Sequence, residues 1–226
     1  MTHRIRAILV TALLLGLVTT TGCALPSYKT LSREQQAAVR SVSITKSVAL
    51  PEVPLVFGPS VNAGGFLFGP LALATATSSD NPDSQALTKH FADHMIDLGE
   101  IVREEFIARL AQIRAFPAVD VAQGDANFEL VVESYGLNAA GFSPLSPVNH
   151  PLIPTLRLGA KLTTRNGEVL WENHANLPAM DNRIEGHMFE EILANPDQTR
   201  EAFRKAAEIV SGDLLKDFGV HPASVH

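Results

Sequence analysis

The sequence predicts an α+β fold, a two-layer sandwich in which two long helices cover one face of a mainly antiparallel sheet of about four strands. Apolar residues recur at intervals of three or four over residues 81–113 and 196–218, which is typical of helices with one buried face. Other segments alternate apolar and polar residues, which is typical of strands with one buried face. These segments are residues 41–50, 128–137, 155–164 and 168–177. Because both kinds of element need a shared apolar layer, the expected order is β-α-β-β-β-α.

The first 22 residues have the layout of a secretory signal peptide. Arg4 and Arg6 precede a weakly polar to apolar run over residues 7–18, and small residues then lead to Cys23, the only cysteine. The run is too short to cross a bilayer as a helix, which takes about 20 apolar residues. We therefore expect residues 1–22 to be removed.

The sequence Thr20-Thr21-Gly22-Cys23 resembles the lipobox of bacterial lipoproteins, in which a signal peptidase cuts before the cysteine and a lipid is attached to it. The family usually has Leu where this chain has Thr20. The resemblance implies that a fatty acid such as palmitate on Cys23 anchors the protein in the cell envelope. Ala24 in place of an aspartate implies, by the same analogy, the outer membrane, facing the periplasm. An ordinary signal peptide followed by an incidental cysteine is the alternative.

The mature chain is acidic. Removing residues 1–22 takes two arginines from the 18 Lys and Arg and leaves all 24 Asp and Glu, so the net charge becomes −8. A dispersed acidic excess argues against a nucleic-acid partner, which would need clustered Lys and Arg. About 200 residues suit a single domain with a real core. We assign it to residues 41–219, after a lipid anchor and tether over 23–40 and before a flexible tail over 220–226.

Ser32 and Gln35 have capping-box spacing, which predicts a helical turn near the end of the tether. The first strand follows over residues 41–50. Pro51 and Pro54 are expected to end it, because proline cannot donate a hydrogen bond within a sheet.

Residues 54–79 form a segment of 26 positions without a charged side chain. Pro59, Pro70 and several glycines exclude a stable transmembrane helix. The segment is predicted to be an apolar loop laid against the domain or a partner; contact with lipid or an apolar ligand, and a pore-forming hairpin, are the alternatives. The residues expected to contact a partner or lipid are Phe57, Phe66, Leu67, Phe68 and Leu71.

Asn81, Pro82 and Asp83 are typical of a helix start, as cap, first helical residue and acidic side chain at the positive end of the dipole. One apolar stripe then continues to residue 113, which predicts a single long helix with Gly99 as a candidate point for a bend. The stripe consists of Leu87, Phe91, Met95, Leu98, Val102, Phe106, Leu110 and Ile113.

A short strand is expected over residues 118–121 and a longer one over 128–137. The string Gly-Asp-Ala-Asn-Phe-Glu-Leu at 124–130 is similar to a recurring element of envelope lipoproteins. Residues 138–154 contain four prolines, which predicts a long loop without regular structure.

The last two strands are predicted to form a hairpin with Asn166-Gly167 as a two-residue type I′ turn. The resulting register brings apolar side chains together on one face and opposite charges together on the other. The pairs are Arg165 with Glu168, Lys161 with Glu172, Leu162 with Trp171 and Leu158 with Ala175. A short helix is expected over residues 187–193, and Asn195-Pro196 begins a final helix that extends to about Phe218.

We find no motif for catalysis, a cofactor or a metal. His90 and His94 lie four residues apart on one helix face, but two ligands are fewer than zinc takes, and a solvated or partly packed helix edge is predicted. The sequence has no Gly-x-Ser-x-Gly elbow and no phosphate-binding Gly-Lys-Ser/Thr loop. We therefore predict that the protein is not an enzyme.

The lipobox and the order of elements resemble small periplasmic lipoproteins that assist larger envelope machines, such as the auxiliary lipoproteins of lipid-trafficking ABC transporters and the lipopolysaccharide-assembly lipoprotein. The resemblance implies an accessory or scaffold subunit that docks an envelope protein through residues 54–79 or the exposed face of the sheet. Two alternatives are a binder of a lipid or other apolar ligand, and a subunit of an oligomeric pore as in curli-type secretion lipoproteins.

Overall fold

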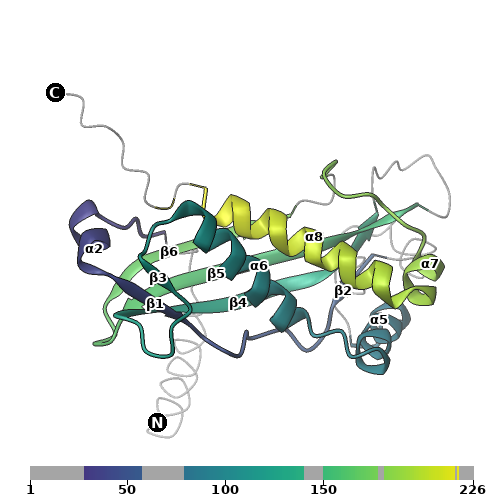
Figure 1. Ribbon diagram of the computed structural model, residues 1–226. Helices are drawn as coiled ribbons and strands as arrows, with labels where there is room; N and C mark the ends of the chain where they lie inside the picture. The colour runs from purple at the N-terminus through teal and green to yellow at the C-terminus, as the bar shows by residue number, and fades with distance from the viewer. Residues whose placement is uncertain (1–27, 58–78, 140–149, 178–180, 217, 219–226) are drawn as a thin grey trace, which may run out of the picture.

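The fold, seen in a computed structural model, is described for residues 28–57, 79–139, 150–177, 181–216 and 218. One sheet and a layer of helices make up the two layers (Figure 1). The predicted α+β class is confirmed. Within the described residues the sheet has six strands, two more than predicted, and it is mixed.

The strands follow the order β3-β1-β4-β5-β6, and β2 also pairs with β4. Their bounds are β1 Ser41–Ile44, β2 Leu55–Val56, β3 Ala118–Val119, β4 Ala126–Ala139, β5 Leu152–Thr164 and β6 Val169–Asn176. Strands β4, β5 and β6 are antiparallel, as predicted. Strands β1, β2 and β3 are parallel to their neighbours, so the prediction is wrong for this edge. A long helical connection leads from β2 to β3, and such crossovers bring strands together in parallel.

Residues 41–57 run beside β4 over most of its length. After β1 the chain makes an isolated bridge between Ala49 and Val131, and β2 then pairs Leu55 with Gly136. The predicted strand over 41–50 is therefore regular only to Ile44, and the prolines interrupt the edge without ending it.

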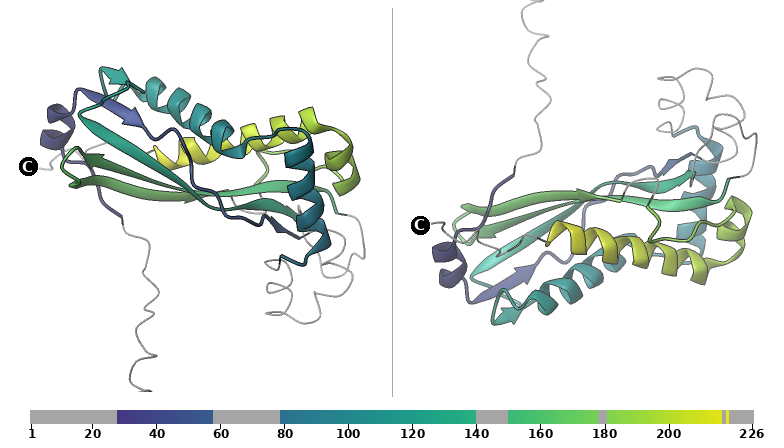
Figure 2. Two further views of the ribbon diagram at one scale, coloured as in Figure 1. Left: turned by 90° about the horizontal axis from the view of Figure 1, so that it is seen from below. Right: turned by 90° about the horizontal axis from the view of Figure 1, so that it is seen from above.

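The helices are α2 Arg33–Ala38, α5 Pro82–Asp93, α6 Leu98–Ile113, α7 Phe189–Ala194 and α8 Pro196–Leu214. Helices α6 and α8 contact each other and cover one face of the sheet, while α5 lies across one end (Figures 1 and 2). The prediction of two long helices on one face is confirmed for α6 and α8. Among the described residues, no helix covers the opposite face (Figure 2).

The single helix predicted from residue 82 to 113 is wrong, because the chain breaks between α5 and α6. Met95 has a left-handed backbone with φ of 50° and is 87% exposed, so it does not belong to the buried stripe. Asp97 then caps α6 by accepting a hydrogen bond from the Glu100 N–H at 2.9 Å. The predicted apolar stripe is therefore divided between two helices. Leu87 and Phe91 belong to α5, and the residues from Leu98 onward belong to α6.

The hairpin has the predicted register in its middle and a different turn. Leu162 lies opposite Trp171, as predicted, but Thr163 pairs with Val169, which leaves residues 165–167 as the loop. Only Gly167 has a positive φ there, 83°. A type I′ turn needs positive φ at both central residues, so a three-residue loop forms and a bulge in β6 restores the register.

The loop predicted over residues 138–154 is too long at both ends. Strand β4 continues to Ala139, and β5 begins at Leu152 and includes Pro154, which lies opposite Leu137. Residues 140–149 lie outside the described part. The last helix begins at its predicted Asn195 cap and ends at Leu214 rather than near Phe218.

The core lies between the sheet and the two long helices. Phe106 of α6, Phe128 of β4 and Phe203 of α8 are fully buried. Phe218 lies beyond α8 and packs its ring edge-on to Trp171 at 4.9 Å between centroids. Phe218 and Trp171 therefore cover the end of the core beside β6.

Candidate functional site

Most of the predicted contact residues lie outside the described part of the chain: Cys23, Phe66, Leu67, Phe68 and Leu71. Phe57 is described and half-buried. Its backbone N–H donates to the Leu137 carbonyl at 2.9 Å, directly after β2. Phe57 therefore extends the pairing of β2 with β4.

The face of β4, β5 and β6 that points away from α6 and α8, here called the open face, carries a cluster of polar side chains. Arg157 Nε lies 2.5 Å from Glu133 Oε2, and His174 Nδ1 contacts Glu133 Oε1. The three residues come from β5, β4 and β6, so one carboxylate joins three neighbouring strands.

Gly159 lies between these side chains and gives them room. A Cβ built on Gly159 would lie 2.9 Å from Glu133 Oε1 and 3.0 Å from His174 Nδ1. Both distances are too short for a side chain to be added without displacing the Glu133 and His174 contact. Glycine inside a strand indicates such a close approach.

Both carboxylate oxygens of Glu133 are in contact, one with Arg157 and one with His174. The His174 side chain is 17% exposed, and its Nε2 is buried without a hydrogen-bond partner among the described residues. The arrangement can hold three strands together and present a polar surface. No local sequence pattern marks this cluster except Gly159, because its residues come from three strands that are far apart in the chain.

The first described residues pair with the free edge of β6. Lys29 N–H donates to the Glu172 carbonyl at 2.9 Å, and Glu172 N–H donates back to the Lys29 carbonyl at 3.0 Å. Lys29 Nζ also donates to the Val169 carbonyl. The Tyr28 ring lies edge-on to the His174 ring, with centroids 6.0 Å apart. We call Tyr28 and Lys29 the N-terminal clamp.

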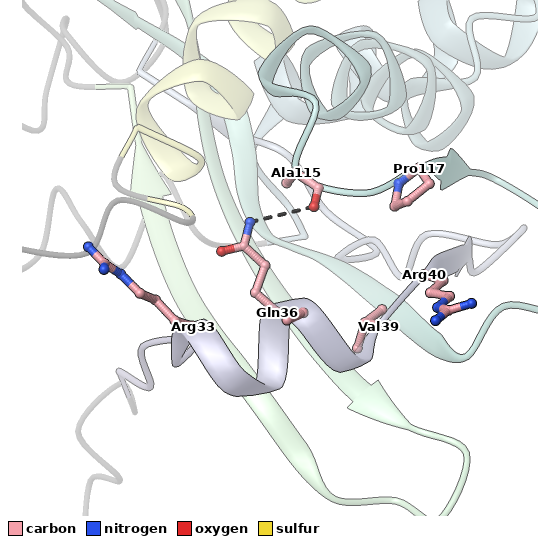
Figure 3. A pocket seen from close by; sticks show the side chains of 7 residues that line it. Arg33, Gln36, Val39, Arg40, Ala115 and Pro117 are labelled. Atoms are coloured by element: carbon pink, nitrogen blue, oxygen red, sulfur yellow. Dashed lines mark hydrogen bonds between the residues drawn. The ribbon is translucent and has the colours of Figure 1, made fainter.

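The chain beyond the clamp also contacts the domain. Leu31 is buried, and Ser32 and Gln35 form the predicted capping box at the start of α2. Gln36 of this helix donates to the Ala115 carbonyl at 3.5 Å. A groove of about 640 Å³ lies here between α2 and the segment after α6, with Arg33 and Arg40 at its rim (Figure 3).

A second groove, of about 450 Å³, lies at the corner between α5 and α6. Its lining is mainly apolar and includes Leu50, Phe91, Met95 and Tyr135. Met95 and Leu50 are 87% and 40% exposed, whereas burial raises the pKa of the Tyr135 hydroxyl. We call this the corner groove.

His90 and His94 have different surroundings although they share a helix face. His90 is buried, and its Nε2 lies 3.2 Å from Thr199 Oγ1, which itself donates to the Ile192 carbonyl at 2.7 Å. The hydroxyl therefore accepts from His90, which assigns the proton to Nε2. Burial and the neighbouring His94 lower the pKa of His90. This geometry joins α5 to α8 and makes His90 a neutral core residue.

Within the described ranges, no three His, Cys, Asp or Glu side chains are placed to hold a metal ion. None of the helices there has the length and apolar character needed to cross a membrane. No protein-family model matches the chain, and a search of curated proteins finds none that is significantly similar.

Proposed function

We propose that the protein is a lipid-anchored, non-enzymatic periplasmic lipoprotein that serves as an accessory or scaffold subunit of an envelope assembly or transport system. The observation on which this rests is the sequence Thr20-Thr21-Gly22-Cys23 after a signal-like segment. The N-terminal clamp is consistent with it. Tyr28 follows Cys23 by five residues, a stretch that spans at most about 18 Å. An acylated Cys23 would therefore hold the folded body close to the bilayer.

The lipid is tested by mass spectrometry of the protein purified from host membranes. We expect a fatty-acylated N-terminal peptide that begins at Cys23. The Cys23→Ser variant should keep residues 1–22 and lack the lipid, because both processing steps need the thiol. A soluble product with an unmodified Cys23 would overturn the proposal.

The outer-membrane location is tested by separating the two membranes on a density gradient. We expect the protein in the outer-membrane fraction. Ala24→Asp should move it to the inner-membrane fraction, while Ala24→Ser serves as the matched control and should not. Inner-membrane location of the unchanged protein would refute this part of the proposal and leave the lipid anchor standing.

The accessory role predicts an envelope partner. Crosslinking in intact cells, followed by purification through a C-terminal tag, should recover the same envelope protein repeatedly. Recovery should fall when Cys23→Ser prevents attachment of the lipid. Recovery of no envelope protein after efficient crosslinking would contradict the accessory role.

A second candidate function is binding of a lipid or other apolar ligand at the corner groove, a site other than the residues 54–79 for which the sequence predicted it. The observation that favours it is the corner groove, since an exposed methionine beside an apolar hollow is typical of adaptable binding surfaces. A fluorescent fatty acid should then bind the purified body, and Met95→Asp should weaken binding while Lys89→Asp, on the exposed surface of α5, should not. Equal binding by both variants would exclude the corner groove.

A further inference from the structure

We infer that the open face of the sheet lies against the lipid headgroups of the membrane that holds Cys23. The inference rests on the proposed lipid anchor and adds the orientation of the body. Four observations support it: where the chain joins the body, how far the anchor reaches, how charge is divided between the two faces, and which side chains the open face carries.

The chain joins the body on the open-face side. Lys29 pairs with Glu172 at the free edge of β6, and the Tyr28 ring contacts His174, whose own ring reaches toward Glu133 across Gly159. Tyr28 therefore lies at the open face, and the helices lie on the other side of the sheet (Figure 2).

The reach of the anchor is short compared with the body. Five residues separate Cys23 from Tyr28, which allows at most about 18 Å. Strand β5 alone has 13 residues, or about 43 Å of length. If the helices faced the bilayer, the same five residues would have to pass around the sheet edge and a helix layer about 10 Å thick. When the open face lies against the bilayer, the five residues do not have to pass around the sheet.

Charge is unequal between the two faces. Helices α6, α7 and α8 contain nine Asp and Glu against five Lys and Arg, a net −4. The open face around the clamp has three of each sign: Glu129, Glu133 and Glu172, with Lys29, Arg157 and Lys161. Anionic lipids repel the helix layer, and the repulsion acts over about 8–10 Å at physiological salt. The balanced face is therefore the one that a membrane surface tolerates.

The open face also has side chains suited to the interfacial region. Tyr28 is 68% exposed, and tyrosine is enriched where membrane meets water. Val131, 44% exposed, is an apolar side chain between Glu129 and Glu133 on β4. Arg157 and Lys161 lay long aliphatic stems on this face, and their charges pair with Glu133 and Glu129.

The orientation can be measured because the body has no cysteine other than Cys23. Single variants Val131→Cys on the open face, Lys205→Cys on α8 and Asn166→Cys at the hairpin tip would each carry a fluorophore. The acylated proteins are placed in vesicles of phosphatidylethanolamine and phosphatidylglycerol with a nitroxide quencher on a fraction of the headgroups. We expect several-fold stronger quenching at residue 131 than at residue 205, with residue 166 between them.

The outcomes separate orientation from anchoring. Vesicle flotation that depends on Cys23, with quenching strongest at residue 205 or 166, would overturn the orientation and leave the anchor standing. Absence of flotation would overturn the anchor itself. A photocrosslinker at residue 131 that captures a protein in native membranes, in place of lipid, would also overturn the orientation.

The clamp provides a matched pair of variants. Lys29→Pro removes the N–H that donates to the Glu172 carbonyl, whereas Lys29→Ala keeps this backbone bond. Lys29→Pro should make quenching at residues 131 and 205 more alike. Flotation with the vesicles and the melting temperature of the body should both stay unchanged. Lys29→Ala should keep the difference. An unchanged difference in Lys29→Pro would contradict the role of the clamp.

Discussion

At the scale of single residues, Gly136 lies against the backbone of β2 with no room for a side chain. A Cβ on Gly136 would lie 1.8 Å from the Leu55 carbonyl oxygen and 2.5 Å from its carbon. These are backbone atoms of a paired strand, so no side-chain movement can make room. Glycine at this position is what allows residues 55 and 56 to pair with β4.

Gly136→Ala should therefore displace β2 and lower the free energy of unfolding by about 3 kcal/mol, at the upper end of the cost of overpacking. The control is Gly212→Ala in α8, where the nearest atoms belong to the flexible Arg109 guanidinium. Urea unfolding followed by circular dichroism measures both. A Gly136→Ala protein as stable as the unchanged one would show that the close approach is absent.

The buried imidazole of His90 makes stability depend on pH. Its pKa lies below the ordinary value of 6.5, first because of burial and then because of His94. The unfolded chain thus binds more protons between pH 6.5 and the folded pKa, so stability falls as the pH drops through this window, and the loss is complete below the folded pKa.

His90→Gln should remove most of this pH dependence, since an amide can donate to Thr199 Oγ1 without titrating. The control His94→Gln should keep most of it, because burial of His90 is the largest cause. The measurement is the urea midpoint at pH 7.5 and at pH 5 for each protein. The same loss of midpoint in His90→Gln would assign the effect to another group.

At the scale of elements, the break between α5 and α6 determines how the helix layer covers the sheet. Helix α5 packs at one end, and α6 lies along the sheet beside α8 (Figure 2). The cap at Asp97 fixes where α6 starts, and the left-handed Met95 changes the direction of the chain before it.

Asp97→Ala should lower the free energy of unfolding by about 1 kcal/mol, because the Glu100 N–H loses its acceptor. Asp97→Ser should retain most of the stability, since serine is an equally good cap. The comparison is made by thermal unfolding of the three proteins. Equal losses in Asp97→Ala and Asp97→Ser would show that the carboxylate acts through something other than the cap.

At the scale of the whole molecule, the sheet and helices share one core, and Trp171 is the only tryptophan. Phe218, beyond α8, packs on Trp171 and on Phe128 at 5.9 Å between centroids. Removing the Phe218 ring therefore removes the packing of this residue on Phe128 of β4 and Trp171 of β6.

Phe218→Ala should cost about 3 kcal/mol, as for other buried phenylalanines, and should shift Trp171 emission to the red. Lys216→Ala, on the exposed side, is the matched control and should change neither. Tryptophan fluorescence and far-ultraviolet circular dichroism should report the same unfolding midpoint. Separate midpoints would indicate that the two layers unfold independently.

The sequence predicted the α+β class, the antiparallel hairpin of β5 and β6, a layer of helices on one face and the caps at Ser32, Asn81 and Asn195. It missed the parallel edge formed by residues 41–57, because pairing direction depends on where a connection returns and leaves no local pattern. The sequence wrongly placed Met95 in the buried stripe, because the spacing of apolar residues continues through the break between α5 and α6. Asp97, a residue type favoured at helix N-caps, was the signal for that break. The Glu133 cluster and the clamp were missed because their partners lie far apart in the chain.

The sequence by itself determined the secondary structure type of most of the long segments and the register in the middle of the hairpin, since each depends on neighbours along the chain. Only the tertiary structure decided the direction of strands β1 to β3, the face on which the chain enters the body and the division of charge between the faces. These features depend on contacts between segments whose positions in space are set by packing of the whole core.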